Sequence, residues 1–158
     1  MEEIEGVSVD SMSNDIAFRD AGVEDCNDLF KWRNHTGIRK YFFNSDPVSW
    51  SEHKRWFDVK SKDSNTNIYI ACCGEEKVGT VRFDDVDDSV KVSVMLNPDY
   101  LNKGLGSEII GLAVEEYKNK IKMGKTIIAE IRNDNIASIK AFTKAGFGEH
   151  HRVLVYNI

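Results

Sequence analysis

The spacing of apolar side chains along the chain predicts an alternation of short strands and amphipathic helices. Apolar residues at alternate positions indicate a half-buried strand, whereas apolar residues three or four apart indicate a helix. These patterns predict strands at 16–18, 67–73, 78–83, 90–96, 126–131 and 153–158, and helices at 23–34, from Ser49 or Ser51 onward, at 104–120 and at 135–144. The order β-α-α-β-β-β-α-β-α-β is typical of an α/β protein with one mixed sheet and helices on both faces.

Turn-forming residues separate these elements. The first hairpin is expected to turn at residues 74–77, and the second at the acidic run 84–88. Gly146 stands where a left-handed residue commonly ends a helix, so it is predicted to close the helix at 135–144. Residues 1–14 are polar, acidic and without a period, and we expect a mobile tail there, followed by a single domain at 15–158.

The length and charge of the chain narrow the classes of function. With 158 residues, 41% of them apolar, the chain can bury a core of ordinary size. The formal net charge is −5, and the first 15 residues carry five acidic side chains and no basic one. Because the remaining 143 residues hold 21 acidic and 21 basic side chains, the chain has no global basic footprint for nucleic acid.

Cysteine content and hydropathy set aside the secreted and membrane classes. Three cysteines, two of them adjacent, do not form a disulfide framework. No segment has the roughly 18 consecutive apolar residues that span a bilayer, and the N-terminus is acidic where a signal peptide is basic. The acidic run 84–88 lacks the ligand spacing of a calcium loop, and no His/Cys pair has zinc spacing. The sequence therefore predicts a cytoplasmic, globular protein without a metal.

A glycine-rich segment, residues 101–107 (Leu-Asn-Lys-Gly-Leu-Gly-Ser), lies between a predicted strand and the longest predicted helix. Glycines let the backbone approach a ligand, and the free N–H groups of a first helical turn bind anions such as pyrophosphate. A Rossmann fingerprint would need glycine where Ile109 stands, and a P-loop would need lysine where Ser107 stands. On spacing alone, a glycine-rich helix entry without a ligand is the alternative.

A second motif favours the ligand. Residues 130–135 (Glu-Ile-Arg-Asn-Asp-Asn) leave a strand, and Ser138, Phe142, Gly146 and Phe147 follow at fixed offsets. Together the two motifs resemble the GCN5-related N-acetyltransferase (GNAT) family, over residues 16–158. In that family the first motif cradles the pyrophosphate of acetyl-CoA and the second contacts the pantetheine and thiol. The resemblance implies the GNAT fold: a mostly antiparallel, twisted sheet, helices on both faces, and splayed strands at the CoA site.

The resemblance also implies the residues that bind acetyl-CoA. They are Met95, Leu96, Asn102, Lys103, Gly104, Leu105, Gly106, Ser107, Asn135, Ser138 and Phe142. Leu101 departs from the pattern, because the family usually has Gln or Arg at this position. Since the cradle is mostly main chain, we expect this difference to weaken CoA binding modestly.

Acetyl transfer from a thioester to an amine needs a base, a group that polarises the carbonyl oxygen, and an acid for the leaving thiolate. Glu130 is the predicted base, because related N-acetyltransferases often carry a catalytic glutamate there; the alternative is a strand-end glutamate paired with Arg132 or a lysine. His53 is the second candidate, with a polar position on a surface helix as its alternative. The usual leaving-group tyrosine of the family is replaced by Phe142, which leaves water, Tyr100 or Tyr117 as the acid.

Residues 31–55 predict the acceptor. This stretch has a net charge of +4 and interleaves its basic residues with Trp32, Tyr41, Phe42, Phe43 and Trp50. Such a mixture suits a ligand with phosphates and a flat ring. Residues 28–57 resemble acetyltransferases of nonulosonic acid biosynthesis, which N-acetylate a UDP-linked 4-amino-4,6-dideoxy sugar on the way to pseudaminic acid. This resemblance implies acceptor contacts from Trp32, Arg33, Asn34, Arg39, Phe43 and His53.

Two alternatives stay open at this point. Ribosomal-protein N-terminal acetyltransferases begin with a similar Trp-Arg-Asn helix, so a peptide α-amine is the second candidate acceptor. With Leu101 and Phe142 at family positions, a CoA-binding module without turnover is the third reading. The final strand predicted at 153–158 could pair across a homodimer.

Overall fold

The computed structural model describes residues 15–120 and 124–157. Within these residues the sheet has five strands in the order β1-β2-β3-β4-β5. The strands are β1 (Ile16–Asp20), β2 (Thr66–Cys73), β3 (Glu76–Val86), β4 (Ser89–Leu96) and β5 (Thr126–Ile128). The first four are antiparallel neighbours, and β5 runs parallel to β4. The predicted α/β class with one mixed sheet is confirmed.

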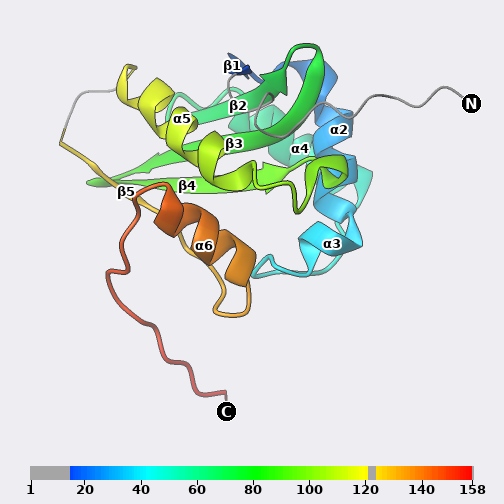
Figure 1. Cartoon of the computed structure of the whole chain (residues 1–158). Helices are drawn as coiled ribbons and strands as arrows, with labels where there is room; N and C mark the ends of the chain where they lie inside the picture. The colour runs from blue at the N-terminus through cyan, green and yellow to red at the C-terminus, as the bar shows by residue number, and fades with distance from the viewer. Residues whose placement is uncertain (1–14, 121–123, 158) are drawn as a thin grey trace, which may run out of the picture.

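Helices cover both faces of this sheet, as predicted (Figure 1). Ile68 and Ile70 of β2 face the cluster formed with α2 (Cys26–Asn34), α3 (Thr36–Arg39) and α4 (Trp50–Lys60). Tyr69 and Ala71, on the opposite face, belong to the cluster formed with α5 (Gly106–Lys118) and α6 (Ile136–Lys144). Short 3-10 turns at Val23–Asp25 and Pro98–Tyr100 precede α2 and the glycine-rich segment. The side-chain alternation of β2 thus separates two cores.

Local capping signals fix the ends of two helices. Ser49 begins α4 with a capping box, in which its Oγ accepts from the N–H of Glu52 and its own N–H donates to Oε2 of Glu52 at 2.9 Å. Ser49, rather than Ser51, is therefore the cap. Gly146 follows α6 with φ +101°, the left-handed role predicted for it.

Three predicted elements differ in the structure. The strand expected at 126–131 ends at Ile128, because the chain then leaves β4. The acidic run 84–88 is mostly strand, with its turn at residues 87–88, because Lys60 and Arg82 neutralise Asp84 within β3. Residues 153–157 form no strand: they extend away from the sheet with exposed side chains and no strand beside them (Figure 1). The described residues therefore lack the final strand that was expected to pair across a homodimer.

One buried ionic group ties β1 and β3 to the start of α2. Asp25 is fully buried and accepts hydrogen bonds from both terminal nitrogens of Arg19, at 2.6 and 2.8 Å, and from the N–H of Gly22 at 2.8 Å. Nζ of Lys77 lies 2.8 Å from its other oxygen. Burial alone would raise the pKa of Asp25, but these hydrogen bonds outweigh burial and hold that pKa well below its usual range.

Two further expectations concern the N-terminal tail and membrane-spanning segments. The tail predicted at 1–14 lies outside the described residues. Among the residues that are described, no helix is both long and apolar enough to cross a membrane.

Candidate active site

β4 and β5 pair over only part of their length. Ser89, Val90 and Lys91 lie opposite Thr126, Ile127 and Ile128, and there the pairing stops. β4 continues to Leu96, whereas the chain beyond Ile128 diverges from it. The two segments therefore form a V whose vertex lies at Lys91 and Ile128, and whose open end faces the end of β4. This is the splay that the resemblance implied.

The pairing of β4 with β3 decides which main-chain groups line this V. The N–H of Asn97 donates to the carbonyl of Val78 at 3.0 Å, so Asn97 directs its main-chain groups toward β3, as Met95 does by alternation. Val94 and Leu96 therefore direct theirs into the V, beyond the last pair with β5. The prediction for Met95 needs correction at this level: its main chain faces β3, while its side chain packs with the α2–α4 cluster.

The glycine-rich segment 101–107, called the glycine loop below, joins the open end of the V to α5. Asn102 and Gly104 have φ of +59° and +74°, and a Cβ on Gly104 would meet nothing within 4 Å. Leu105 precedes α5 without a side-chain cap, so the first N–H groups of the helix have no capping side chain. Main-chain N–H groups in such a left-handed turn form a concavity suited to an anion.

Residues of the second motif support the glycine loop through α6. A Cβ on Gly106 would lie 3.4 Å from Cβ of Ala141, which shows how closely α5 begins against α6. Asn135 caps α6, its Oδ1 accepting from the N–H of Ser138 at 3.2 Å. Phe142 is only 5% exposed and packs edge-on against Phe147 at 5.0 Å between ring centres. Phe142 is thus a core residue, and its predicted contact with CoA is not available in this packing.

The two tyrosines considered as leaving-group acids lie in different surroundings. Tyr117 is 1% exposed and stacks on Phe83 with 4.1 Å between ring centres, so its hydroxyl is enclosed in the core. Tyr100 lies beside the glycine loop, with Nζ of Lys103 4.9 Å from its ring centre. Burial raises the pKa of Tyr100, so its phenol stays protonated at neutral pH.

Glu130 lies at the vertex of the V. Its Oε1 accepts from Nζ of Lys91 at 3.1 Å, and both side chains are about half exposed. Val90 and Val92 point into the α5 cluster, so Lys91 projects to the opposite face of the sheet, the face of α2–α4. The carboxylate of Glu130 reaches the same face. Of the alternatives left open for Glu130, a lysine partner is the one found, since Arg132 pairs with Asp134.

His53 is a packing residue. It is 5% exposed, and its Nε2 donates to the carbonyl of Cys26 at 2.9 Å, which joins α4 to α2. Its ring packs among Phe30, Trp50 and Trp56. Burial lowers the pKa of His53, so the imidazole is neutral at neutral pH. This placement removes His53 from the candidate bases and from the candidate acceptor contacts, because no acceptor can reach the ring.

The remaining predicted acceptor contacts hold a segment of their own chain, residues 42–48, called the acceptor segment below. Trp32 is buried in the α2–α4 core. Arg33 donates to the carbonyl of Asn44 at 2.8 Å, and Arg39 donates to that of Ser45 at 2.9 Å. The side chain of Asn34 exchanges two hydrogen bonds of 2.9 Å with the main chain of Val48. Phe43, also on this segment, is 71% exposed, so it alone of the predicted set is both on the segment and free to meet a ligand.

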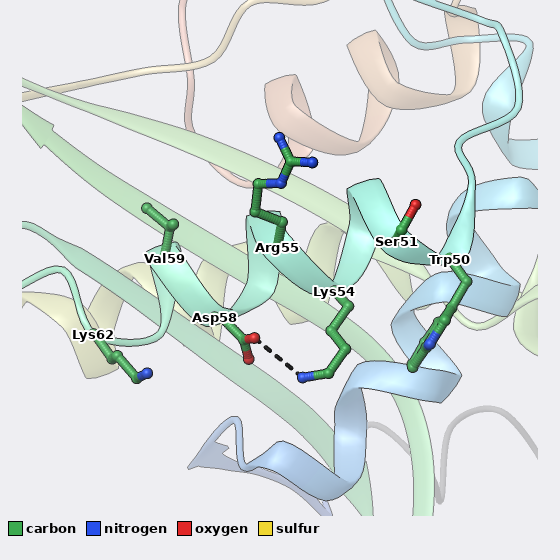
Figure 2. Close-up of a pocket in the computed structure, with 7 residues that line it drawn as sticks. All are labelled: Trp50, Ser51, Lys54, Arg55, Asp58, Val59 and Lys62. Carbon is green, nitrogen blue, oxygen red and sulfur yellow. Dashed lines mark hydrogen bonds and ion pairs between the residues drawn. The ribbon is translucent and has the colours of Figure 1, made fainter.

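A hollow of about 610 Å³ lies on the outer face of α4, lined by Trp50, Ser51, Lys54, Arg55, Asp58, Val59 and Lys62 (Figure 2). Lys54 and Asp58 pair within it at 3.1 Å. Its lining contains no residue of the glycine loop or of the V. Among the described residues no group of three His, Cys, Asp or Glu side chains could hold a metal ion.

Comparison with known proteins decides the family. Residues 15–148 match the model of the acetyltransferase (GNAT) domain. The chain belongs to the GNAT family. This GNAT protein is an N-acetyltransferase that uses acetyl-CoA, and the reading as a module without turnover is set aside.

Individual relatives are similar over most of this GNAT chain. Acetyltransferase PseH of Campylobacter jejuni is 22% identical over 131 residues, which cover 82% of this chain and 81% of that protein. The spermidine N-acetyltransferase of Vibrio cholerae in complex with CoA and spermine superposes with a TM-score of 0.75 at 16% identity, covering 87% and 83% of the two chains. AAC(6')-Ib in complex with ribostamycin and CoA gives 0.76 at 20% identity, covering 87% and 86%. The two structural likenesses show the fold.

Proposed function

We propose that this GNAT enzyme acetylates the primary amine of a phosphate-bearing acceptor, specifically the 4-amino group of a UDP-linked amino-deoxy sugar. The observation that carries the proposal is the charge of the acceptor side. Arg33 and Arg39 lie against the acceptor segment, and Arg132 donates to the carbonyl of Phe42. Such a cluster of cations attracts a diphosphate and repels a polyamine or an aminoglycoside.

The carboxylates nearby do not reverse this field. Asp134 is held by Arg132 through two hydrogen bonds of 3.0 and 2.8 Å. This pair is neutral, so Arg33 and Arg39 supply the positive field, against the one carboxylate of the acceptor segment, Asp46. A polycationic acceptor would need several free carboxylates, as its ammonium groups must be matched after leaving water. The similarity to Acetyltransferase PseH and the resemblance of residues 28–57 to nonulosonic acid enzymes support the same acceptor class.

The geometry of the V supports a course for acetyl-CoA. Its pyrophosphate would bind the main-chain N–H groups of the glycine loop, which lies at the open end of the V. The pantetheine would then follow the free edge of Val94 and Leu96 toward the vertex, in the manner of an added strand. This course brings the thioester toward Glu130, on the sheet face that the acceptor segment shares.

In the proposed reaction Glu130 takes a proton from the ammonium of the acceptor, and the neutral amine attacks the thioester carbon. Free N–H groups of β4 stabilise the negative oxygen that develops. The C–S bond then breaks, the nitrogen loses its second proton to water as the amide forms, and the thiolate takes a proton from water. Water is the proposed proton donor because Phe142 carries no hydroxyl, the hydroxyl of Tyr117 is buried, and Tyr100 lies beside the glycine loop, at the opposite end of the V from Glu130.

A panel of acceptors tests this proposal. Free-thiol release from acetyl-CoA is measured with a UDP-linked 4-amino-4,6-dideoxy sugar, an N-terminal peptide, spermidine, ribostamycin, and no acceptor. The expected result is fast release with the UDP-sugar alone, and competitive inhibition by UDP against that sugar. Faster release with spermidine, ribostamycin or the peptide would overturn the acceptor assignment, while release from none would overturn the function.

A further inference from the structure

We propose that Arg132 is a positioning residue, which sets the acceptor site by tying the acceptor segment to the arm of the V that carries Glu130. The inference rests on the proposed function and adds the residue that joins its two halves. Arg132 was not among the residues that the sequence singled out as functional. It lies two residues after Glu130, on the segment that diverges from β4.

Arg132 makes two kinds of contact: one orients its guanidinium, and the other joins it to the acceptor segment. Its Nε and Nη2 donate to the two carboxylate oxygens of Asp134, at 3.0 and 2.8 Å, which fixes the plane of the guanidinium. The remaining nitrogen, Nη1, donates to the carbonyl of Phe42 at 3.3 Å, 90 residues away along the chain. Lysine could not make both contacts, because a single ammonium cannot span the carboxylate and the carbonyl.

The other end of this link is held from α2. The guanidinium of Arg33 lies over the ring of Phe42, 4.3 Å from its centre, and donates to the carbonyl of Asn44. Phe42 itself packs on the α2–α4 core together with Met95. Phe42 is thus fixed by Arg33 on its ring and by Arg132 on its carbonyl. Phe43, the residue after this doubly held Phe42, is exposed.

This double hold gives the acceptor segment a defined distance from the base. Without Arg132, the segment would remain attached to α2 and α3 through Arg33, Asn34 and Arg39 and packed on the α2–α4 core through Phe42, but it would lose its hydrogen bond to the arm of Glu130. An amine bound on the segment would then reach the thioester in a broader range of positions. A positioned acceptor lowers the entropic cost of the reaction. Loosening the acceptor segment should therefore first raise the KM for the acceptor.

The test compares Arg132→Met with Arg132→Lys and with the matched control Arg152→Met. Arg152 also donates from Nε to a carboxylate, that of Glu149 at 2.8 Å, but it is exposed and lies beyond α6. For each protein we would measure kcat, KM for the UDP-linked amino sugar, KM for acetyl-CoA, the midpoint of thermal unfolding, and amide hydrogen exchange of residues 42–48.

The expected result for Arg132→Met is a KM for the UDP-sugar raised roughly tenfold, the low end of the effect of a lost hydrogen bond from a charged group. KM for acetyl-CoA should stay unchanged, and amide exchange should quicken within residues 42–48. Arg132→Lys should recover part of the acceptor KM, and Arg152→Met should match the wild type. Equal changes in both KM values, or unchanged exchange at 42–48, would overturn the positioning role. If the wild-type enzyme acetylates no acceptor, the proposed function fails separately, and hydrogen exchange still decides whether Arg132 holds the segment.

Discussion

Replacing Glu130 by Gln removes the proposed base while keeping the shape of the side chain. The pair with Lys91 is half exposed, and exposed ion pairs contribute about 0–1 kcal/mol to folding. The free energy of unfolding should therefore fall by no more than about 1 kcal/mol. A positioned general base contributes roughly 100- to 10,000-fold to rate, so kcat should drop by that factor at neutral pH. The structure thus predicts a large catalytic effect with a small structural one.

The assay is thiol release at saturating acetyl-CoA and UDP-sugar from pH 6 to 10, with acetyl-CoA binding and thermal unfolding measured in parallel. Glu149→Gln is the matched control, because Glu149 is an exposed glutamate paired with Arg152, at 2.8 Å. The Glu130→Gln variant should bind acetyl-CoA with unchanged Kd and recover rate as pH rises and the amine deprotonates in solution. Wild-type kcat across the pH range would refute Glu130 as the base, and a loss of rate explained by unfolding would contradict the small structural effect.

Three other substitutions probe the remaining parts of the structure. Gly104→Val forces a branched side chain into φ +74°, a strain of about 1–2 kcal/mol, and should weaken acetyl-CoA binding measured by calorimetry, whereas Gly111→Ala inside α5 should not. His53→Gln keeps an N–H donor for the carbonyl of Cys26 and should leave the pH profile of kcat unchanged; a lost alkaline or acid limb would restore His53 as a base. Asp25→Asn should lower the free energy of unfolding in urea by about 1–3 kcal/mol, because it removes the buried charge that Arg19 and Lys77 bind, while Arg19 stays partly exposed and Lys77 keeps its pair with Asp28. Since the folded pKa of Asp25 is depressed, its stabilisation is present above the unfolded pKa of about 3.9 and is lost as pH falls toward the folded pKa; the Asn variant should lack this acid dependence.

The features that could be predicted from the sequence are those determined by residues close together along the chain. The cap at Ser49 depends on Glu52 three residues later, and the end of α6 depends on Gly146. The glycine loop was likewise visible, because Gly104 has φ +74°, a backbone conformation that favours glycine. The alternation of apolar residues in β4 predicted which face of this strand is buried. Signals of this kind are local, and the structure confirms the elements they define.

What sequence could not predict depends on partners far along the chain. His53 looked like an accessible imidazole until Cys26, on another helix, was found to accept its hydrogen bond. Arg33 and Asn34 looked like ligand contacts, yet they hold main-chain groups of the acceptor segment. The edge of β4 that is free for a ligand follows from its register with β3, which shifts the available groups from Met95 to Val94. A one-residue register decides this, and no single strand carries that information.

A crystal structure with CoA and UDP bound tests most directly whether the V and the glycine loop form the active site. The predicted result places the CoA pyrophosphate on the main-chain N–H groups of residues 102–107, the pantetheine along Val94 and Leu96, and the sulfur toward Glu130. UDP should lie beside the acceptor segment, near Phe43. CoA seated elsewhere, such as the hollow on the outer face of α4, or a sulfur directed away from Glu130, would contradict the proposed site.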